Sequence, residues 1–287
     1  MNKKKIGFID YYISEWHANH YPQWIKEANE RLGTDYEVAY VWAERDISPV
    51  DGISTDEWCK RFRVSRCDTI AELCKKSDYI MILAPSDPDK HFRYAKDAFP
   101  CGKRIYVDKT FAPDLKTAKA IFKIADACQT PFFSTSALRY ATELREIGKA
   151  NHMIFTAGGQ SFNEYVIHPV EMAVSLLRDP VQKVKVEPIG AQRICRIVTR
   201  NDADAAIIYS PAAAYSITGQ CNGIFFQKNI TSNFFSDLIT DILRFFESGQ
   251  LPFDPAQTLE VMRVRDALLK AESQDGDWIE PDPYEEA

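Results

Sequence analysis

Apolar and polar positions alternate in two rhythms along the first half of the chain. Short runs of apolar and β-branched residues predict strands, and apolar residues spaced three or four apart predict helices. Strands that are apolar throughout and separated by amphipathic helices are typical of a parallel sheet covered on both faces. Strands are expected at 6–9, 37–42, 79–84, 104–107 and 131–136, and helices at 22–32, 68–77, 89–99 and 114–128.

The rhythm changes after about residue 137. One helix is expected at 169–179, and several strand-like stretches then follow without helices between them, which is typical of a mostly antiparallel sheet. We therefore predict an α/β fold class in two domains. Residues 1–136 form a Rossmann-type parallel-sheet domain, and residues 137–287 form an α+β domain with an open sheet. Amphipathic helices are expected at 233–249 and 258–272, and this C-terminal helix is a candidate to pack back on the first domain.

Composition narrows the class of protein. The 287 residues carry a net charge of −6, so nothing attracts nucleic acid or an anionic membrane. The longest apolar runs, such as 80–85, are far shorter than a membrane span, and no signal peptide is expected. Seven cysteines without a C-x-x-C pair indicate reduced thiols and no metal site. We expect a cytoplasmic protein whose partner is a small-molecule substrate.

Residues 78–139 contain several short motifs in a defined order. Two later segments, 161–172 and 247–279, continue this series of motifs. This order resembles the Gfo/Idh/MocA family, named after glucose–fructose oxidoreductase and inositol dehydrogenase, over residues 5–279. The resemblance implies hydride transfer between NAD or NADP and a sugar, cyclitol or related polyol, and a homo-oligomer, either a dimer or a tetramer. The motifs are Pro85-Ser86 at a strand end, His91, Gly102-Lys103 before the next strand, and Asp108-Lys109-Thr110 after it.

The resemblance implies three catalytic residues. Lys109 follows a buried strand and could donate a hydrogen bond to a substrate oxygen, although a surface lysine in a strand–helix loop is the alternative. His168 precedes Pro169, which predicts that it lies at or next to a helix N-cap, where the positive helix end favours a neutral imidazole that acts as general base. Glu164 would orient His168 or bind a hydroxyl. A capping histidine and a solvated glutamate are the alternative.

The resemblance also implies contacts with the cofactor. Pro85, Ser86, His91 and Asp108 fall where the family's chain passes the ribose and nicotinamide. Ser86 could instead cap the next helix, and His91 could be a helix-surface residue.

Three further residues are candidates for contacts with the cofactor or the substrate. Glu44, after the strand at 37–42, would favour NAD through its charge, unless it is a solvated loop residue. Arg139 and Tyr140 are candidates for substrate hydroxyls, although a lone arginine is more often structural.

The phosphate loop departs from the family pattern. The family has G-x-G-x-x-G, whereas residues 10–20 read DYYISEWHANH and contain no glycine. Asp10 also sets a carboxylate near the expected pyrophosphate. Either the backbone amides of Tyr12, Ile13 and Ser14 hold the cofactor beside the Pro85–Ser86 wall, or Tyr11, Tyr12 and Trp16 fill the slot. A metal site from Asp10, His17 and His20 has weak support.

The start of the first helix is part of the same question. Pro22 favours a helix that begins there, so 10–21 would be a long loop; a start near Ser14 would enclose Pro22. The sequence thus supports two hypotheses. The first is an NAD(P)-dependent oxidoreductase acting on a polyol. The second is a degenerate family member that binds a small ligand or partner without redox chemistry.

Overall fold

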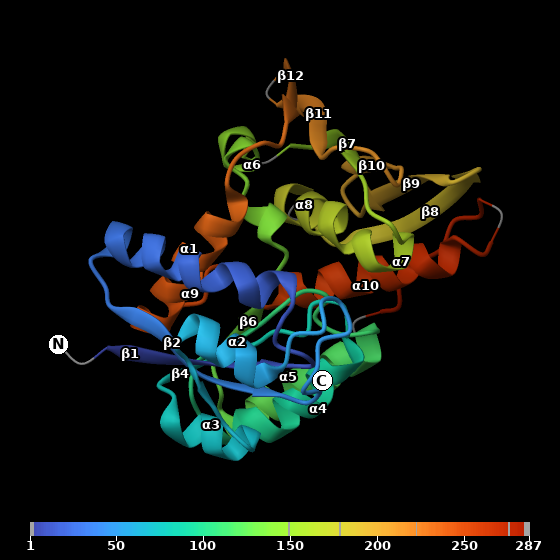
Figure 1. The fold of residues 1–287 in the computed structure, drawn as a ribbon. Coiled ribbons are helices and arrows are strands. Elements are labelled where there is room, and N and C mark those ends of the chain that lie inside the picture. The colour runs from blue at the N-terminus through green and yellow to red at the C-terminus, as the bar shows by residue number, and fades with distance from the viewer. Residues whose placement is uncertain (1–2, 149, 178, 222, 275, 284–287) are drawn as a thin grey trace. The chain divides into compact units, whose positions relative to one another are not determined.

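The computed structural model describes residues 3–148, 150–177, 179–221, 223–274 and 276–283. The chain divides into two compact units, one of residues 1–135 and 235–255 and the other of 136–234 and 256–287 (Figure 1). The first division thus lies one residue before the expected boundary. The helix that rejoins the first unit is α9 (Phe234–Ser248), whereas we had expected this of α10 (Ala256–Ala271), which belongs to the second unit.

The first unit contains a six-stranded parallel sheet, as the apolar runs predict. Its strand order is β3-β2-β1-β4-β5-β6, so the order reverses between β1 and β4, where Ile9 pairs with Ile82. Ligands of such sheets bind beyond the carboxyl ends of the strands at this reversal. The strands are β1 (Lys4–Asp10), β2 (Tyr36–Ala43), β3 (Ser65–Arg66), β4 (Tyr79–Ile82), β5 (Ile105–Val107) and β6 (Phe132–Ser134).

Five helices accompany these strands, and α9 joins them from later in the chain. The aromatic ring of Phe246 on α9 stacks on Tyr79 with centroids 4.8 Å apart. Arg104 donates to the carbonyl oxygens of Phe246 and Glu247 at the carboxyl end of α9. The others are α1 (Trp16–Leu32), α2 (Thr55–Phe62), which the pattern did not reveal, α3 (Ile70–Lys76), α4 (Asp89–Ala98) and α5 (Leu115–Cys128).

The start of α1 differs from the prediction. The helix begins at Trp16, six residues before Pro22, which lies in its interior. Glu15 is its N-cap and accepts hydrogen bonds from the backbone N–H groups of His17 and Ala18. The helix ends at Leu32, as predicted, and Gly33 after it adopts the left-handed conformation that closes the helix. The long loop expected over 10–21 is therefore wrong, because a glutamate satisfies the amides of the first turn.

The second unit contains a six-stranded sheet in the order β12-β11-β7-β10-β9-β8. All neighbours are antiparallel except β7 and β10, which confirms a mostly antiparallel sheet. The strands are β7 (His152–Ala157), which was not predicted, β8 (Val181–Ile189), β9 (Gln192–Thr199), β10 (Asp204–Tyr209), β11 (Ser216–Cys221) and β12 (Ile224–Asn229).

The helices of the second unit lie against this sheet and around its edge. Contacts join α8 to β7 and β10, and α10 to β8. None of the helices in the described parts of the chain is long and apolar enough to cross a bilayer. Besides α10, the helical segments are a 3-10 turn η2 (Ala137–Tyr140), α6 (Thr142–Ile147), α7 (Phe162–Tyr165) and α8 (Ile167–Leu177).

A glycine lets β1 and α3 approach closely. A Cβ atom at Gly7 would lie 2.4 Å from the Ser77 hydroxyl oxygen and 2.5 Å from a methyl carbon of Leu73. We therefore expect Gly7→Ala to lower the free energy of unfolding by about 1–3 kcal/mol through overpacking.

Urea unfolding of Gly7→Ala, Leu73→Ala and the double variant tests this contact. The double variant should be less destabilised than the sum of the two single variants, because Leu73→Ala makes room for the new methyl group. Strict additivity would show that the close approach is not what constrains Gly7.

Candidate functional site

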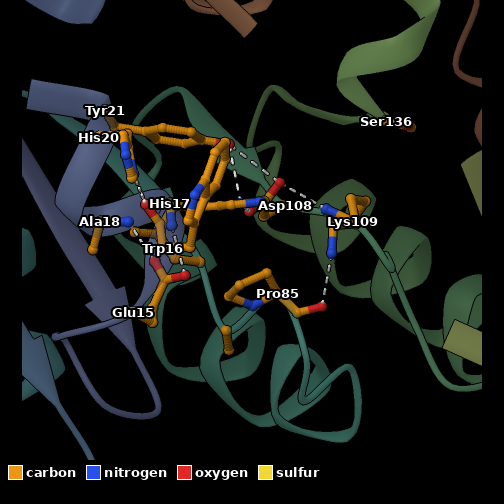
Figure 2. A network of polar contacts seen from close by, with 12 residues as sticks. Glu15, Trp16, His17, Ala18, His20, Tyr21, Pro85, Asp108, Lys109 and Ser136 are labelled. Atoms are coloured by element: carbon orange, nitrogen blue, oxygen red, sulfur yellow. Dashed lines mark hydrogen bonds and ion pairs between the residues drawn. The ribbon is translucent and has the colours of Figure 1, made fainter. Parts of the chain in front are cut away.

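A buried carboxylate organises the end of β5. Asp108 is 1% exposed, and its Oδ2 forms an ion pair with Nδ1 of His17 on α1. Its Oδ1 accepts hydrogen bonds from the Tyr106 hydroxyl at 3.0 Å and from the backbone N–H of Lys109 at 2.9 Å. Figure 2 shows Asp108 between His17 and Lys109. The carboxylate therefore fixes the backbone at the residue that was predicted to be catalytic.

The charge of Asp108 is stabilised in place. Burial by itself would raise the pKa of this carboxyl, but the charge and hydrogen bond of His17, together with Lys109, bring the pKa below its usual value. The Tyr21 hydroxyl lies 3.3 Å from His17 Nδ1, and burial followed by the charge of Asp108 raises the pKa of Tyr21. Tyr21 thus remains a neutral phenol beside the ion pair.

Lys109 lies at a strand end, as predicted. Its ammonium donates to the carbonyl oxygen of Pro85 at 3.3 Å, and the side chain remains partly exposed. The peptide bond between Lys109 and Thr110 is cis. Lys109 and Pro85 therefore meet at the carboxyl ends of the neighbouring strands β5 and β4 (Figure 2).

His91 and Ser86 lie differently from the alternatives considered for them. His91 is fully buried on α4, with its ring nitrogens at the carbonyl oxygens of Phe111 and Leu83, so the expectation of a helix-surface residue is wrong. These contacts hold the segments after β4 and β5 in place. Because the His91 side chain is fully buried, it has no exposed atoms that could contact a ligand. Ser86 is exposed, and α4 has Pro88 rather than Ser86 at its N-cap.

Asp10 replaces the first glycine of the family's loop. It is 1% exposed, and its Oδ1 accepts hydrogen bonds from the backbone N–H of Tyr11 at 2.7 Å and of Ala84 at 3.0 Å. The side chain thus bridges the ends of β1 and β4, where the strand order reverses. Its Oδ2 is buried and has no hydrogen-bond partner among the groups that the structure describes.

Glu15 replaces the third glycine. It is 7% exposed, and its carboxylate accepts from the backbone N–H of His17 at 2.7 Å and from that of Ala18 (Figure 2). A carboxylate of the chain itself therefore occupies the amides of the first turn of α1, which bind phosphate in related folds. Burial raises the pKa of Glu15, and burial followed by the charge of Glu15 raises the pKa of Asp10 well above its usual value.

Three amides of the loop have no described acceptor, and of their residues Ile13 and Ser14 are each 1% exposed. No described group accepts a hydrogen bond from the backbone N–H of Tyr12, Ile13 or Ser14. Three consecutive N–H groups at a strand-to-helix turn are a donor set suited to phosphate oxygens. The raised pKa of Asp10 bears on the objection from like charge, because only the ionised form of the carboxyl repels phosphate.

Trp16 belongs to another cluster. It is 49% exposed and its ring lies against His20, Trp24 and Phe235, with centroids 4.4, 5.6 and 4.9 Å away. These contacts lie along α1 and α9, so they do not support Trp16 as a residue that fills the phosphate slot. Within the described ranges, no group of three or more His, Cys, Asp or Glu residues could hold a metal ion.

Glu44 is bound rather than solvated. It follows β2, and its carboxylate accepts from the Tyr94 hydroxyl at 2.5 Å, from Lys90 at 3.2 Å and from Arg93 at 2.6 Å. Burial by itself would raise its pKa, but these three donors bring the pKa below its usual value. The alternative of a solvated loop glutamate is wrong, and two cations stand beside the carboxylate expected to bind the ribose.

In the second unit, a serine lies within hydrogen-bond distance of His168, the residue predicted to be the general base. His168 is the second residue of α8, and its Nδ1 lies 2.7 Å from the Ser136 hydroxyl oxygen. The helix begins at Ile167, so His168 lies just inside its positive end. Sequence reasoning missed Ser136, because it was assigned to the end of a strand and nothing local links it to position 168.

Aromatic rings surround this histidine. The rings of Tyr165 and Tyr215 lie 5.8 and 6.1 Å from the His168 ring. Glu164 lies on α7, one residue before Tyr165, and burial followed by the charge of Glu164 raises the pKa of Tyr165. The structure therefore brings Glu164 to the same aromatic environment as His168.

Arg139 and Tyr140 are largely buried on η2. Arg139 forms an ion pair with Glu171 on α8 and donates to the Gln257 side chain at 2.6 Å. These contacts give Arg139 a structural function, and contact of either residue with a substrate stays a prediction.

Comparisons with known proteins bear on the whole chain. No family model matches it. Among curated proteins, an uncharacterised oxidoreductase, YhhX of Escherichia coli (strain K12), is 37% identical over 54 residues, which are 19% of this chain and only 16% of that protein.

Solved structures match over nearly the full length. A probable dehydrogenase from Thermotoga maritima superimposes with a TM-score of 0.79 at 12% identity, covering 96% of this chain and 98% of that one. The scyllo-inositol dehydrogenase of Lactobacillus casei, with bound NAD(H) and scyllo-inositol, gives 0.76 at 13% identity, covering 97% and 99%. Such identities establish the fold alone, and the chain has the same fold as these dehydrogenase structures.

Proposed function

We propose that this protein is an NAD(P)-dependent oxidoreductase that acts on a sugar, cyclitol or related polyol. The observation that carries the proposal is the anchored lysine at the end of β5. Asp108 accepts the backbone N–H of Lys109, and the ammonium of Lys109 remains partly exposed at the edge of the sheet where such folds bind ligands. The full-length likeness to dehydrogenases, two of which are described with NAD or NAD(H), supports the same reading.

Lys109 acts as a hydrogen-bond donor to the substrate oxygen. A lysine whose backbone is fixed by a buried carboxylate can present its ammonium in a defined direction, which stabilises negative charge that develops on an alkoxide. When bound, the nicotinamide accepts or donates the hydride. The amides of Tyr12, Ile13 and Ser14 would hold its pyrophosphate, beside Pro85 and Ser86.

His168 acts as the general base. Its Nδ1 lies within hydrogen-bond distance of Ser136, whose oxygen also accepts from the backbone N–H of Leu138 at 3.3 Å. If Nδ1 donates to that oxygen, Nε2 is the nitrogen that takes the hydroxyl proton. Ser136 is then a positioning residue that selects the tautomer, and Glu164 assists from α7.

NAD is the preferred cofactor. Glu44 directly follows β2, where an acidic residue grips the adenosine ribose in such folds, and a carboxylate at that position would oppose the additional phosphate of NADP. Lys90 and Arg93 neutralise part of this charge. The preference for NAD therefore depends on the ion pairs of Glu44 with both cations, because an unpaired cation could bind the additional phosphate of NADP.

A homo-oligomer in the cytoplasm completes the proposal. Ile154, Ile208 and Phe225 are exposed on the strands of the second sheet, which supports its use as a contact between copies in a dimer or tetramer. All seven cysteines are free thiols, which supports a reducing compartment.

A second candidate function is ligand binding without redox chemistry. Asp10 and Glu15 favour it, because their carboxyl groups already occupy amides that bind phosphate in related folds. Titration with NADH and NADPH, followed by fluorescence and calorimetry, separates the two. Saturable binding supports the oxidoreductase, whereas no binding at millimolar cofactor would leave the second candidate.

Removing the lysine should separate chemistry from binding. With a panel of inositols and aldoses as substrates, we expect Lys109→Ala to lower turnover by about 10²–10⁴-fold, because the donor to the substrate oxygen is lost. The dissociation constant for NADH should change much less. Lys96→Ala removes the same charge from an exposed position on α4 and should behave as wild type. Equal losses in turnover and NADH affinity would argue against this role.

The Ser136–His168 contact predicts a change in the pH–rate profile. We expect His168→Asn to lower turnover by about 10²-fold or more, whereas Ser136→Ala should cause a smaller loss and displace the acid limb of the profile. Ser136→Thr retains the hydroxyl and should restore the wild-type limb. Ser161→Ala, at an exposed N-cap of the same unit, is the matched control. An unchanged profile in Ser136→Ala would mean that the serine does not act through His168.

Cofactor preference should depend on Glu44. We expect Glu44→Gln to improve affinity for NADPH relative to NADH by about tenfold, because Lys90 and Arg93 lose their counter-charge and can pair with the additional phosphate. The ratio of the two dissociation constants measures this. Glu37→Gln, at the opposite, amino end of β2 and paired with Lys3, should leave the ratio unchanged.

A further inference from the structure

Two acids stand in the loop where this fold class keeps glycines. Asp10 follows the end of β1 and Glu15 caps α1, and both are almost completely buried. Each carboxyl accepts two backbone N–H groups, so neither is replaceable by an apolar residue without leaving amides unsatisfied. Two buried carboxylates in one short loop cannot both remain charged without a large electrostatic penalty.

The carboxyl oxygens of Asp10 and Glu15 differ in their hydrogen bonds. Oδ1 of Asp10 accepts two hydrogen bonds, which suits the carbonyl oxygen of a protonated carboxyl. Oδ2 is buried and accepts from no described donor, so negative charge on it would be uncompensated, which favours the protonated form of Asp10. Both oxygens of Glu15 accept from α1 amides, which suits an ionised carboxylate. The geometry thus assigns a single proton, and Asp10 is its carrier.

The same loop contains three backbone donors without a described acceptor. The backbone N–H groups of Tyr12, Ile13 and Ser14 lie between the two acids in sequence and have no described acceptor. A pyrophosphate bound to them adds negative charge next to the pair, at the reversal of strand order between β1 and β4. Binding therefore favours the form of the loop in which the pair holds its proton.

We propose that the pair of Asp10 and Glu15 holds one proton, carried by Asp10, and that this proton allows the loop to bind the pyrophosphate of a dinucleotide without glycines. This inference rests on the proposed function, since it concerns the cofactor of that function. Binding and protonation are then linked: the dinucleotide binds well while the pair is protonated and weakly once the proton is lost. The pair titrates as a unit, so the linkage belongs to both residues.

The surrounding charges agree with this assignment. Burial, followed by the charge of Glu15, raises the pKa of Asp10, and Asp108 acts in the same direction. Burial raises the pKa of Glu15, and His17 opposes that rise. The ionisable groups that face the pair are His17 and Tyr21 on α1, Tyr12 in the loop, Tyr94 on α4 and Asp108 after β5.

The direction of the pH effect follows. Because the folded, free loop has a raised pKa, the proton is present at low pH and is lost as the pH rises through that value. The dissociation constant for NADH should be constant while the proton is present. It should then increase by up to about tenfold per pH unit once the free loop loses the proton. Calorimetry in two buffers of different ionisation enthalpy should detect uptake of up to one proton per NADH in that range.

Asp10→Asn is the decisive variant. The amide keeps an acceptor for the N–H groups of Tyr11 and Ala84 and carries no charge, so it mimics the protonated acid. We expect NADH affinity equal to the low-pH value of wild type at every pH, and no proton uptake. Glu15→Gln should shift the loss of affinity to lower pH, because the charge that raises the pKa of Asp10 is gone. Asp126→Asn, an exposed position on α5, should keep the wild-type slope.

Other results would overturn the inference. Measurable NADH binding that is independent of pH in wild type, or an Asp10→Asn variant that follows the wild-type slope, rejects the proton on the pair and leaves the proposed function intact. Absence of NADH and NADPH binding in every variant at every pH rejects the proposed function and the linkage together. Carbon-13 titration of the carboxyl groups in the free protein provides an independent readout, and two acids that are both ionised at low pH would also reject the proposal.

Discussion

The buried carboxylate of Asp108 is the interaction on which the first unit depends. An ionised group in an apolar interior is tolerated only when charge and hydrogen bonds compensate it. His17, Tyr106 and the backbone N–H of Lys109 provide that compensation. These partners come from α1, β5 and the segment after β5, so one carboxylate couples the start of the first helix to the position of the lysine.

The glycine-free loop builds its strand-to-helix turn in a different way from the glycine form. In the glycine form, the amides at a strand-to-helix turn stay open for a ligand. In this chain the carboxyl groups of Asp10 and Glu15 accept from amides on either side of the turn, and the amides of Tyr12, Ile13 and Ser14 between them have no described acceptor. The side chains of the loop therefore order it. The charge of the loop depends on the protonation of these carboxyl groups, whereas a glycine loop has no side chain that titrates.

The fold could be predicted largely from local patterns. The apolar runs that predict strands and the helical spacing of 114–128 both correspond to observed elements, because each depends on residues close in sequence. The start of α1 was mispredicted because Pro22 is a strong local signal for a first turn, whereas capping by Glu15 is an uncommon use of glutamate. The short helix α2 was missed despite the Ser54–Glu57 capping box at its start.

The candidate site was harder to predict, because its decisive contacts join distant residues. The position of Lys109 followed from the buried strand before it. The contacts of Asp108 with His17, of Asp10 with Ala84 and of Ser136 with His168 join residues between 32 and 91 positions apart. No local pattern encodes such distances, so the sequence indicated the chemistry of these residues but not the partners that give them their functions.

The return of α9 to the first unit has a consequence for how the chain can be divided. The backbone passes between the two units three times, after residues 135, 234 and 255. A fragment that ends at residue 135 would lack Phe246, which stacks on Tyr79, and would leave Arg104 without its carbonyl acceptors on α9. The parallel-sheet unit is therefore not an autonomous N-terminal module. Because residues 235–255 belong to this unit, it can complete its folding only after most of the chain has been synthesised.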